Sequence, residues 1–181
     1  MFTLVIGGAR SGKSGFAQSL CNGAKSVAYL ATARVEDEEM RARVERHRAE
    51  RPSEWWTVEE PLQLGMAVRN ASQQASTVLI DCMTVWLSNL MWELRDQSPD
   101  FLEAAVYKEL EELAATAQTT DLVAVSNEVG FSIVPESSVG RLFRDLQGFL
   151  NQRAAKLADR VYLTVAGIAI PIKPNNLEGR G

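Results

Sequence analysis

The fold of this chain is decided by the stretch Phe2-Thr3-Leu4-Val5-Ile6-Gly7-Gly8-Ala9-Arg10-Ser11-Gly12-Lys13-Ser14. Residues 2–6 predict a buried strand and residues 14–20 predict a helix, so a glycine-bounded loop joins the two. That loop, Gly7-x4-Gly12-Lys13-Ser14, is a complete Walker A pattern. Its backbone N–H groups are expected to point at phosphates, beside the positive N-terminus of the helix. The alternative is a chance match in an ordinary turn, and the two flanking elements argue against it.

The side chains of this loop have separate expected roles. Lys13 is expected to reach the β- and γ-phosphates and to act in catalysis, and the Ser14 hydroxyl to help hold Mg²⁺. Without a nucleotide, we expect the Lys13 side chain to be solvated. The residues expected to contact nucleotide are Gly7, Gly8, Ala9, Arg10, Ser11, Gly12, Lys13 and Ser14.

Strand and helix patterns alternate along the rest of the chain. Strands are predicted at 2–6, 27–31, 55–58, 78–81, 122–125 and, as the last, 161–165; helices are predicted at 14–20, 36–51, 62–74, 84–94, 101–117 and 139–158. Apolar strands that alternate with helices predict an α/β fold with a mostly parallel sheet covered on both faces. Ligands of such sheets bind at the carboxyl ends of the strands.

Composition narrows the class of protein. The length of 181 residues and the 46% of hydrophobic residues fit one globular domain. A net charge of −4 argues against a broad nucleic-acid surface, which is normally basic. Cys21 and Cys82 form neither a CxxC pair nor a zinc motif, which fits a reducing compartment. With no signal-peptide pattern and no apolar run of about 20 residues, we expect a cytoplasmic protein without a membrane span.

Two further segments carry polar residues at the ends of predicted strands. Asp81 follows the apolar run 77–80, as expected of a Walker B acid that holds Mg²⁺, although a turn or helix-cap acid is the alternative. Asn127 and Glu128 follow the strand at 122–125 and open on the same edge as the Walker A loop. They are candidate substrate or metal contacts, and ordinary turn chemistry is the alternative.

His47 is the only histidine of the chain. It shares one face of the predicted helix 36–51 with Met40 and Val44, because the three are spaced four and three residues apart. Spacing alone favours a core or capping role over a nucleophile. The basic residues of this helix could contact phosphates, but they alternate with acids and are as readily explained as a solvated face.

Taken together in order, these motifs resemble one family over nearly the whole chain, to about Pro171. The chain resembles the bifunctional adenosylcobinamide kinase/adenosylcobinamide-phosphate guanylyltransferases of cobalamin biosynthesis. The Walker A loop alone would be unspecific, whereas its combination with a single histidine and an Asn-Glu-Val-Gly loop is specific. The stretches that carry the resemblance are 7–14, 31–34, 45–52, 56–59, 80–90, 126–136 and 144–152.

The resemblance implies a P-loop NTPase fold of the RecA type, a three-layer sandwich, in one domain over residues 1–174. The tail at 175–181 matches no part of the family pattern, and we expect it to be disordered. It implies phosphorylation of adenosylcobinamide by ATP or GTP, and then transfer of GMP from GTP to adenosylcobinamide phosphate through a guanylylated His47. It implies a homo-oligomer, with a trimer as the family's form. It also implies nucleotide contacts at Thr32, Ala33, Arg34, Arg48, Ala49, Glu50, Arg51, Glu59 and Asp81.

One departure and two alternatives remain. Some family members carry a second histidine just before the nucleophile, where this chain has Arg46, so no paired-histidine role carries over. A nucleotide-sensing switch would use the same Walker residues but has no use for a nucleophilic histidine. A plain kinase would leave His47 structural.

Overall fold

A central sheet organises the molecule, which is seen in a computed structural model that describes residues 1–34, 38, 41, 45 and 51–174. Within these residues the sheet has seven strands in the order β3-β2-β4-β5-β1-β6-β7. Neighbouring strands are parallel from β3 through β6, and only β7 runs antiparallel. The strands are β1 Phe2–Gly7, β2 Val27–Ala31, β3 Trp56–Glu59, β4 Thr77–Asp81, β5 Asp121–Asn127, β6 Arg160–Val165 and β7 Ile168–Lys173.

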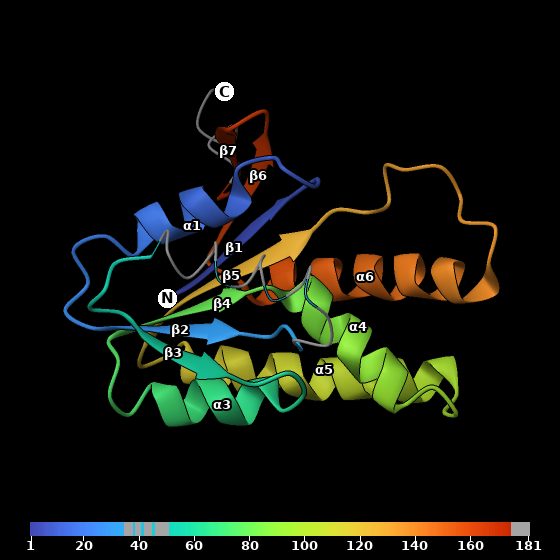
Figure 1. Ribbon diagram of the computed structural model, residues 1–181, viewed down its shortest axis with the longest axis horizontal. Helices are drawn as coiled ribbons and strands as arrows, with labels where there is room; N and C mark the ends of the chain where they lie inside the picture. The colour runs from blue at the N-terminus through green and yellow to red at the C-terminus, as the bar shows by residue number, and fades with distance from the viewer. Residues whose placement is uncertain (35–37, 39–40, 42–44, 46–50, 175–181) are drawn as a thin grey trace.

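Helices cover both faces of this sheet, in unequal number among the described residues. One face carries α3, α4, α5 and α6, and the other carries α1 (Figure 1). The predicted three-layer α/β architecture is therefore confirmed. The described helices are α1 Lys13–Leu20, α3 Leu64–Ala71, α4 Met83–Glu93, α5 Pro99–Thr116 and α6 Ser138–Leu157.

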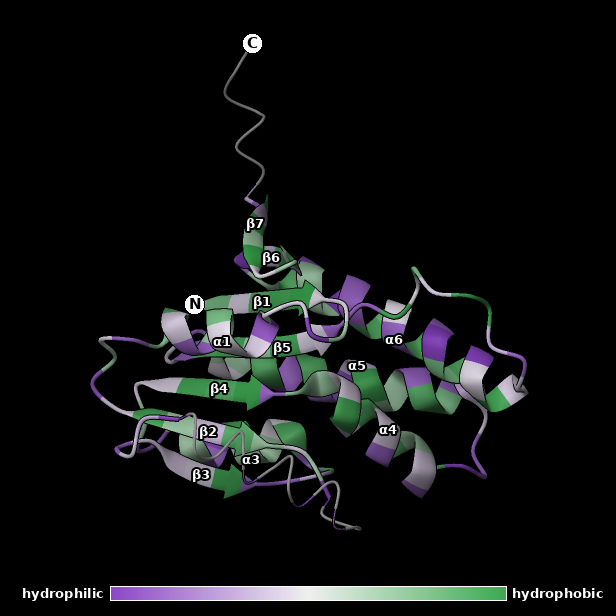
Figure 2. Cartoon of the chain, turned by 45° about the horizontal axis from the view of Figure 1, so that its top comes forward, coloured by the Kyte–Doolittle hydropathy of each residue, from purple (hydrophilic) through white to green (hydrophobic). Residues whose placement is uncertain are grey.

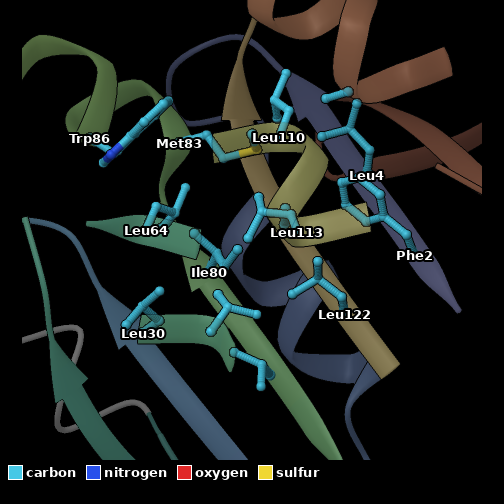
Figure 3. Close-up of a cluster of buried hydrophobic side chains, with 14 of the residues drawn as sticks. Phe2, Leu4, Leu30, Leu64, Ile80, Met83, Trp86, Leu110, Leu113 and Leu122 are labelled. Carbon is cyan, nitrogen blue, oxygen red and sulfur yellow. The ribbon is translucent and has the colours of Figure 1, made fainter. Parts of the chain in front are cut away.

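Alternation along the strands creates two cores. Successive side chains of a strand point to opposite faces. Leu4, Leu30 and Ile80 therefore join the large cluster beneath α3–α6, where Trp86 is fully buried (Figure 3). Their neighbours, among them Val5, pack in a smaller cluster with α1. Apolar colour runs along β1 and β4 in Figure 2, as expected for strands buried from both sides.

The strand prediction fails at one place. The strand at 161–165 was expected to be the last, but β7 follows it and pairs with it as a hairpin. Ala166 and Gly167 make the two-residue turn, and both have positive φ angles, of 52° and 82°. Pro171 inside the run argues against a strand in the sequence, yet it is tolerated because β7 is an edge strand whose outer side needs no ladder hydrogen bond.

The other predicted elements that lie within the described residues are found, with small shifts of their ends. The helix expected from 62 begins at Leu64, because the Glu60 carboxylate accepts hydrogen bonds from the N–H groups of Leu62 and Gln63 (2.8 and 2.9 Å). Most of the predicted helix 36–51 and the tail 175–181 lie outside the described residues. In the described part of the chain, no helix is long and apolar enough to cross a membrane.

Candidate nucleotide-binding site

The Walker A loop leaves the carboxyl end of β1 and leads into α1, as the sequence predicts. Its first glycine is required by crowding, since a Cβ on Gly7 would collide with the backbone oxygen and hydroxyl of Thr164 and with the Ser11 hydroxyl. Gly12 caps α1 with φ 93°, a left-handed conformation that favours glycine. These two positions fix a loop whose N–H groups precede a helix N-terminus, the arrangement that binds anions.

Lys13 lies inside the loop and is not solvated, which corrects the expectation above. The residue is only 8% exposed, and its Nζ donates a hydrogen bond to the Gly8 carbonyl at 2.6 Å. Gly8 itself is exposed. The ammonium group of Lys13, in the first turn of α1, is thus folded back against the backbone of its own loop.

Asp81 ends β4 on the α1 face of the sheet, with its carboxylate held by a tyrosine. The hydroxyl of Tyr29, on the neighbouring strand β2, donates to Asp81 Oδ2 at 2.7 Å. Burial, and then the adjacent Asp81 charge, raise the pKa of Tyr29, so the hydroxyl stays protonated and remains a donor. The Oδ2 atom is therefore oriented, and no hydrogen bond to Oδ1 is found among the described residues.

Arg51 joins this pair from the end of the segment predicted as the basic helix. Its guanidinium carbon lies 3.2 Å from the centre of the Tyr29 ring, a close cation–π contact. Its Nη1 is 3.4 Å from the Thr57 hydroxyl, a long hydrogen bond. Of the residues expected at 48–51, Arg51 is the one the structure describes, and it lies one side chain away from Asp81.

The ends of β2 and β3 place the next expected contacts on the same edge of the sheet. The Thr32 hydroxyl makes two hydrogen bonds with the backbone of Cys82. It donates to the Cys82 carbonyl (2.8 Å) and accepts from the Cys82 N–H (3.1 Å). Glu59 pairs in register with Ala31 and is exposed at this edge. Ala33 is half-buried, and Arg34 lies 3.6 Å from Glu93 at the end of α4.

Strand β5 lies between the Walker A strand and the Asp81 strand, and it ends at Asn127. Asn127 pairs in register with Gly7. Its backbone is fixed on both sides: its N–H donates to the Thr84 hydroxyl at 2.7 Å, and its carbonyl accepts from Asn151 Nδ2 at 2.9 Å. No hydrogen bond of the Asn127 side chain is found among the described residues.

Glu128 is engaged differently. Its N–H donates to the Gly7 carbonyl at 2.9 Å, which ties the loop after β5 to the Walker A loop. Its carboxylate accepts from the N–H of Gly130 at 2.8 Å, which is ordinary turn chemistry. Of the two candidates at the end of β5, Asn127 is thus the one whose side chain makes no hydrogen bond among the described residues and lies beside the Walker A loop.

Cysteine chemistry does not belong to this site. Burial, followed by nearby Asp121, raises the pKa of Cys21 to about 12. Burial, followed by the adjacent Asp81, raises the pKa of Cys82 to about 11. Both thiols are therefore protonated at neutral pH and are poor nucleophiles.

Some expected site residues cannot be placed, and some placed residues were not expected. His47, Arg48, Ala49 and Glu50 lie outside the described residues. Tyr29, Thr84, Asn151 and Thr164 were missed, because each is an ordinary strand or helix residue whose partner lies far away in the sequence. No local pattern marks them.

Known proteins match nearly the whole chain. The family model CobU, described as cobinamide kinase / cobinamide phosphate guanyltransferase, matches residues 3–172. The chain is 41% identical to the bifunctional adenosylcobalamin biosynthesis protein CobU of Escherichia coli K12, over 96% of this chain and 100% of the relative. It is 40% identical to the bifunctional adenosylcobalamin biosynthesis protein CobP of Pseudomonas aeruginosa PAO1, over 96% and 98%.

A solved structure shows the same fold at low identity. An ATPase from the type III secretion system of pathogenic bacteria superposes with a TM-score of 0.52 and 13% identity, over 94% of this chain. The match spans 56% of the ATPase chain, little more than half of its length. The likeness extends the P-loop ATPase fold to this chain.

Proposed function

Because this chain belongs to the cobinamide kinase / cobinamide phosphate guanyltransferase family of transferases, we propose that it carries out both reactions. In the first, ATP or GTP phosphorylates the hydroxyl of the aminopropanol arm of adenosylcobinamide. In the second, GMP passes from GTP to adenosylcobinamide phosphate and gives adenosylcobinamide-GDP. The match to relatives named bifunctional, over 98–100% of their length, supports both activities.

The observation that carries the proposal is the row of groups across β1, β5 and β4. Lys13 is buried in the Walker A loop, Asn127 ends the next strand, and Asp81 ends the strand after it. Phosphoryl transfer needs positioning and charge neutralisation more than covalent help from the protein. Lys13 and the loop amides would hold the phosphates, and the Asn127 carboxamide would orient the transferred group or the attacking hydroxyl.

The residues present fit a magnesium ion. Mg²⁺ is usually held by one or two protein oxygens together with substrate phosphates and water, and not by an all-protein cage. The described residues contain no group of three or more His, Cys, Asp or Glu that could form such a cage. The Ser14 hydroxyl and the carboxylate of Asp81, oriented by Tyr29, are oxygen ligands of the required kind. When bound, the ion would neutralise charge that develops on the phosphates.

For guanylyl transfer we assign the nucleophile to His47. A neutral imidazole nitrogen attacks the α-phosphorus of GTP, a P–N bond forms, and pyrophosphate leaves. An oxygen of adenosylcobinamide phosphate then attacks the same phosphorus, and the P–N bond breaks to return free histidine. An unperturbed imidazole pKa of about 6.5 suits the first step at neutral pH. The family resemblance and the uniqueness of His47 in the chain support this assignment.

We assign the guanine nucleotide contacts of this second step to the edge formed by β2 and β3. They are Thr32, Ala33, Arg34, Arg48, Ala49, Glu50, Arg51 and Glu59. The position of Arg51 beside Tyr29 supports the assignment, because it brings the end of the His47 segment to the Asp81 strand.

We also propose a cytoplasmic homo-oligomer, with a trimer as the first candidate. The loop after β5 supports an interface, since Phe131 and Ile133 are 88% and 93% exposed. Exposed apolar clusters of this kind are typical of interaction sites. The two unpaired cysteines support a reducing compartment.

Labelled GTP tests the function. GTP labelled at the α-phosphate should leave its label on the protein as GMP. Label at the γ-phosphate should not stay on the protein, because it leaves with the pyrophosphate. The mark should vanish in mild acid and survive base, because a phosphoramidate is acid-labile. His47→Asn should lose the mark and guanylyl transfer while keeping phosphorylation of adenosylcobinamide.

Three results would count against parts of the proposal. A wild-type chain that phosphorylates adenosylcobinamide but never gains the mass of GMP is a plain kinase. Guanylyl transfer by His47→Asn would exclude His47, since no other histidine could replace it. Binding of GTP without either transfer would indicate a nucleotide-sensing switch.

A further inference from the structure

The Walker A loop is supported from outside by the hairpin β6–β7. The hydroxyls of Ser11 and Thr164 are 2.9 Å apart and share a hydrogen bond. The Thr164 hydroxyl also donates to the Ile6 carbonyl, at 3.1 Å, in the strand that leads into the loop. Both side chains are buried, Thr164 at 1% and Ser11 at 8% exposure. The Thr164 hydroxyl on β6 thus contacts both the strand residue that precedes the loop, Ile6, and Ser11 within the loop.

The turn of the same hairpin makes a second set of contacts. The N–H of Gly167 donates to the Ser11 carbonyl at 2.9 Å. A Cβ on Gly12 would lie 3.1 Å from the Gly167 Cα, so the two backbones are in close approach. The hairpin therefore contacts the loop at Ser11 and Gly12, the two residues immediately before Lys13.

From these contacts we propose that Thr164 is a positioning residue of the nucleotide site. It acts through its hydrogen bond to the Ser11 side chain, which holds the Walker A loop against β6. The inference rests on the proposed binding of nucleotide phosphates by the Walker A loop. The Ser11 hydroxyl is used against Thr164, so the contribution of Ser11 to nucleotide binding is made by its backbone. The hairpin holds the loop in its binding conformation before the nucleotide arrives.

A pre-set loop has a specific kinetic signature. When the binding-competent conformation is less populated, the apparent dissociation constant rises by the inverse of its population. Saturating nucleotide restores the conformation, so kcat changes little. Loss of the Thr164 hydroxyl should therefore weaken the binding of ATP or GTP in the kinase reaction, and of GTP in guanylyl transfer. The expected effect is about three- to tenfold, the size of one or two net hydrogen bonds.

The test compares Thr164→Val with Thr164→Ser, Ser11→Ala and the double variant. Thr164→Val keeps the branched shape and removes the hydroxyl, and Thr164→Ser returns the hydroxyl. Thr77→Val is the matched control, because Thr77 is a buried strand threonine (4% exposed) at the opposite, amino-terminal end of β4. Dissociation constants for GTP and ATP are measured by calorimetry, together with KM, kcat and the thermal midpoint of each variant.

We expect Thr164→Val to raise Kd and KM with little loss of kcat, Thr164→Ser to restore both, and Thr77→Val to change neither. The double variant should bind no more weakly than Thr164→Val, because the two hydroxyls act as one pair. A folded Thr164→Val with wild-type Kd, or strictly additive effects of the two substitutions, overturns the inference. If Thr164→Val does not fold, Ser11→Ala decides, since a wild-type Kd there also overturns it. Absence of GTP and ATP binding in the wild type would instead refute the proposed function.

Discussion

At the scale of single residues, Lys13 is the side chain on which both proposed reactions depend. Lys13→Ala removes the charge that would face the β- and γ-phosphates. We expect rate losses on the order of 10²–10³ in each reaction, by analogy with removal of one transition-state donor. Assays of both reactions at saturating nucleotide measure the loss. The exposed Lys25→Ala is the control, and unchanged rates in Lys13→Ala would refute the Walker A assignment.

Asp81 is the second residue whose charge can be tested alone. Asp81→Asn keeps the shape and can still accept the Tyr29 hydrogen bond, but it loses the negative charge that would attract Mg²⁺. We expect a higher Mg²⁺ concentration for half-maximal activity, with folding intact. The exposed Asp96→Asn should leave the titration unchanged. If Asp81→Asn also leaves it unchanged, Asp81 is a turn residue and Glu128 becomes the better metal candidate.

What the sequence reveals at this scale depends on sequence distance. The Walker A loop could be predicted because its glycines, Lys13 and Ser14 are contiguous. The partner of Asp81 could not, since Tyr29 lies 52 residues away, and Thr164 lies 153 residues from Ser11. Burial of the Lys13 side chain was also missed, because it depends on how the loop folds back on itself and not on residue type.

At the scale of elements, α6 fixes the end of β5 through a buried polar cluster of Ser126, Gln147 and Asn151. Asn151 Oδ1 accepts from Ser126 Oγ (2.6 Å) and from Gln147 Nε2 (3.0 Å), while its Nδ2 donates to the Asn127 carbonyl. Gln147 and Ser126 are fully buried. Helix α6 therefore sets the backbone from which the Asn127 side chain projects.

Asn151→Leu should disrupt this cluster and Asn127 with it. The substitution keeps the volume but leaves buried donors without acceptors, so we expect a loss of unfolding free energy on the order of 1–3 kcal/mol. Phosphorylation of adenosylcobinamide should also slow, because the Asn127 backbone loses its support. Denaturant unfolding and a kinase assay measure the two effects. Gln152→Leu, at the next and exposed position of α6, should show neither.

Elements were predictable where burial imposes a pattern. The strands β1, β2, β4 and β5 are apolar runs buried from both faces, and each was predicted close to its observed bounds. Strand β7 was not, because Ile168, Ile170 and Ile172 are exposed at the sheet edge and Pro171 interrupts the run. An edge strand pairs with one neighbour only and is partly exposed, so its sequence shows less of the continuous apolar run that marks a buried strand.

At the scale of the whole molecule, the loop between β5 and α6 is the most exposed apolar segment described. It projects beyond the helices in Figure 1, and it carries Phe131, Ile133 and Val134. If this loop forms a subunit interface, Ile133→Ser should lower the mass measured by light scattering while the chain stays folded by circular dichroism. A wild-type chain that runs as a monomer would refute the oligomer proposal, and an unchanged mass in Ile133→Ser would place the interface elsewhere.

The place of β1 in the sheet has a consequence in time. Both of its neighbours, β5 and β6, begin more than a hundred residues after β1 ends. At a synthesis rate of about 5–20 residues per second, roughly 6–24 s pass between the synthesis of β1 and the end of β5. Strands β2, β3 and β4 can pair among themselves meanwhile. The Walker A loop is therefore made before the two strands that position it, and it can take its final place only after they have been made.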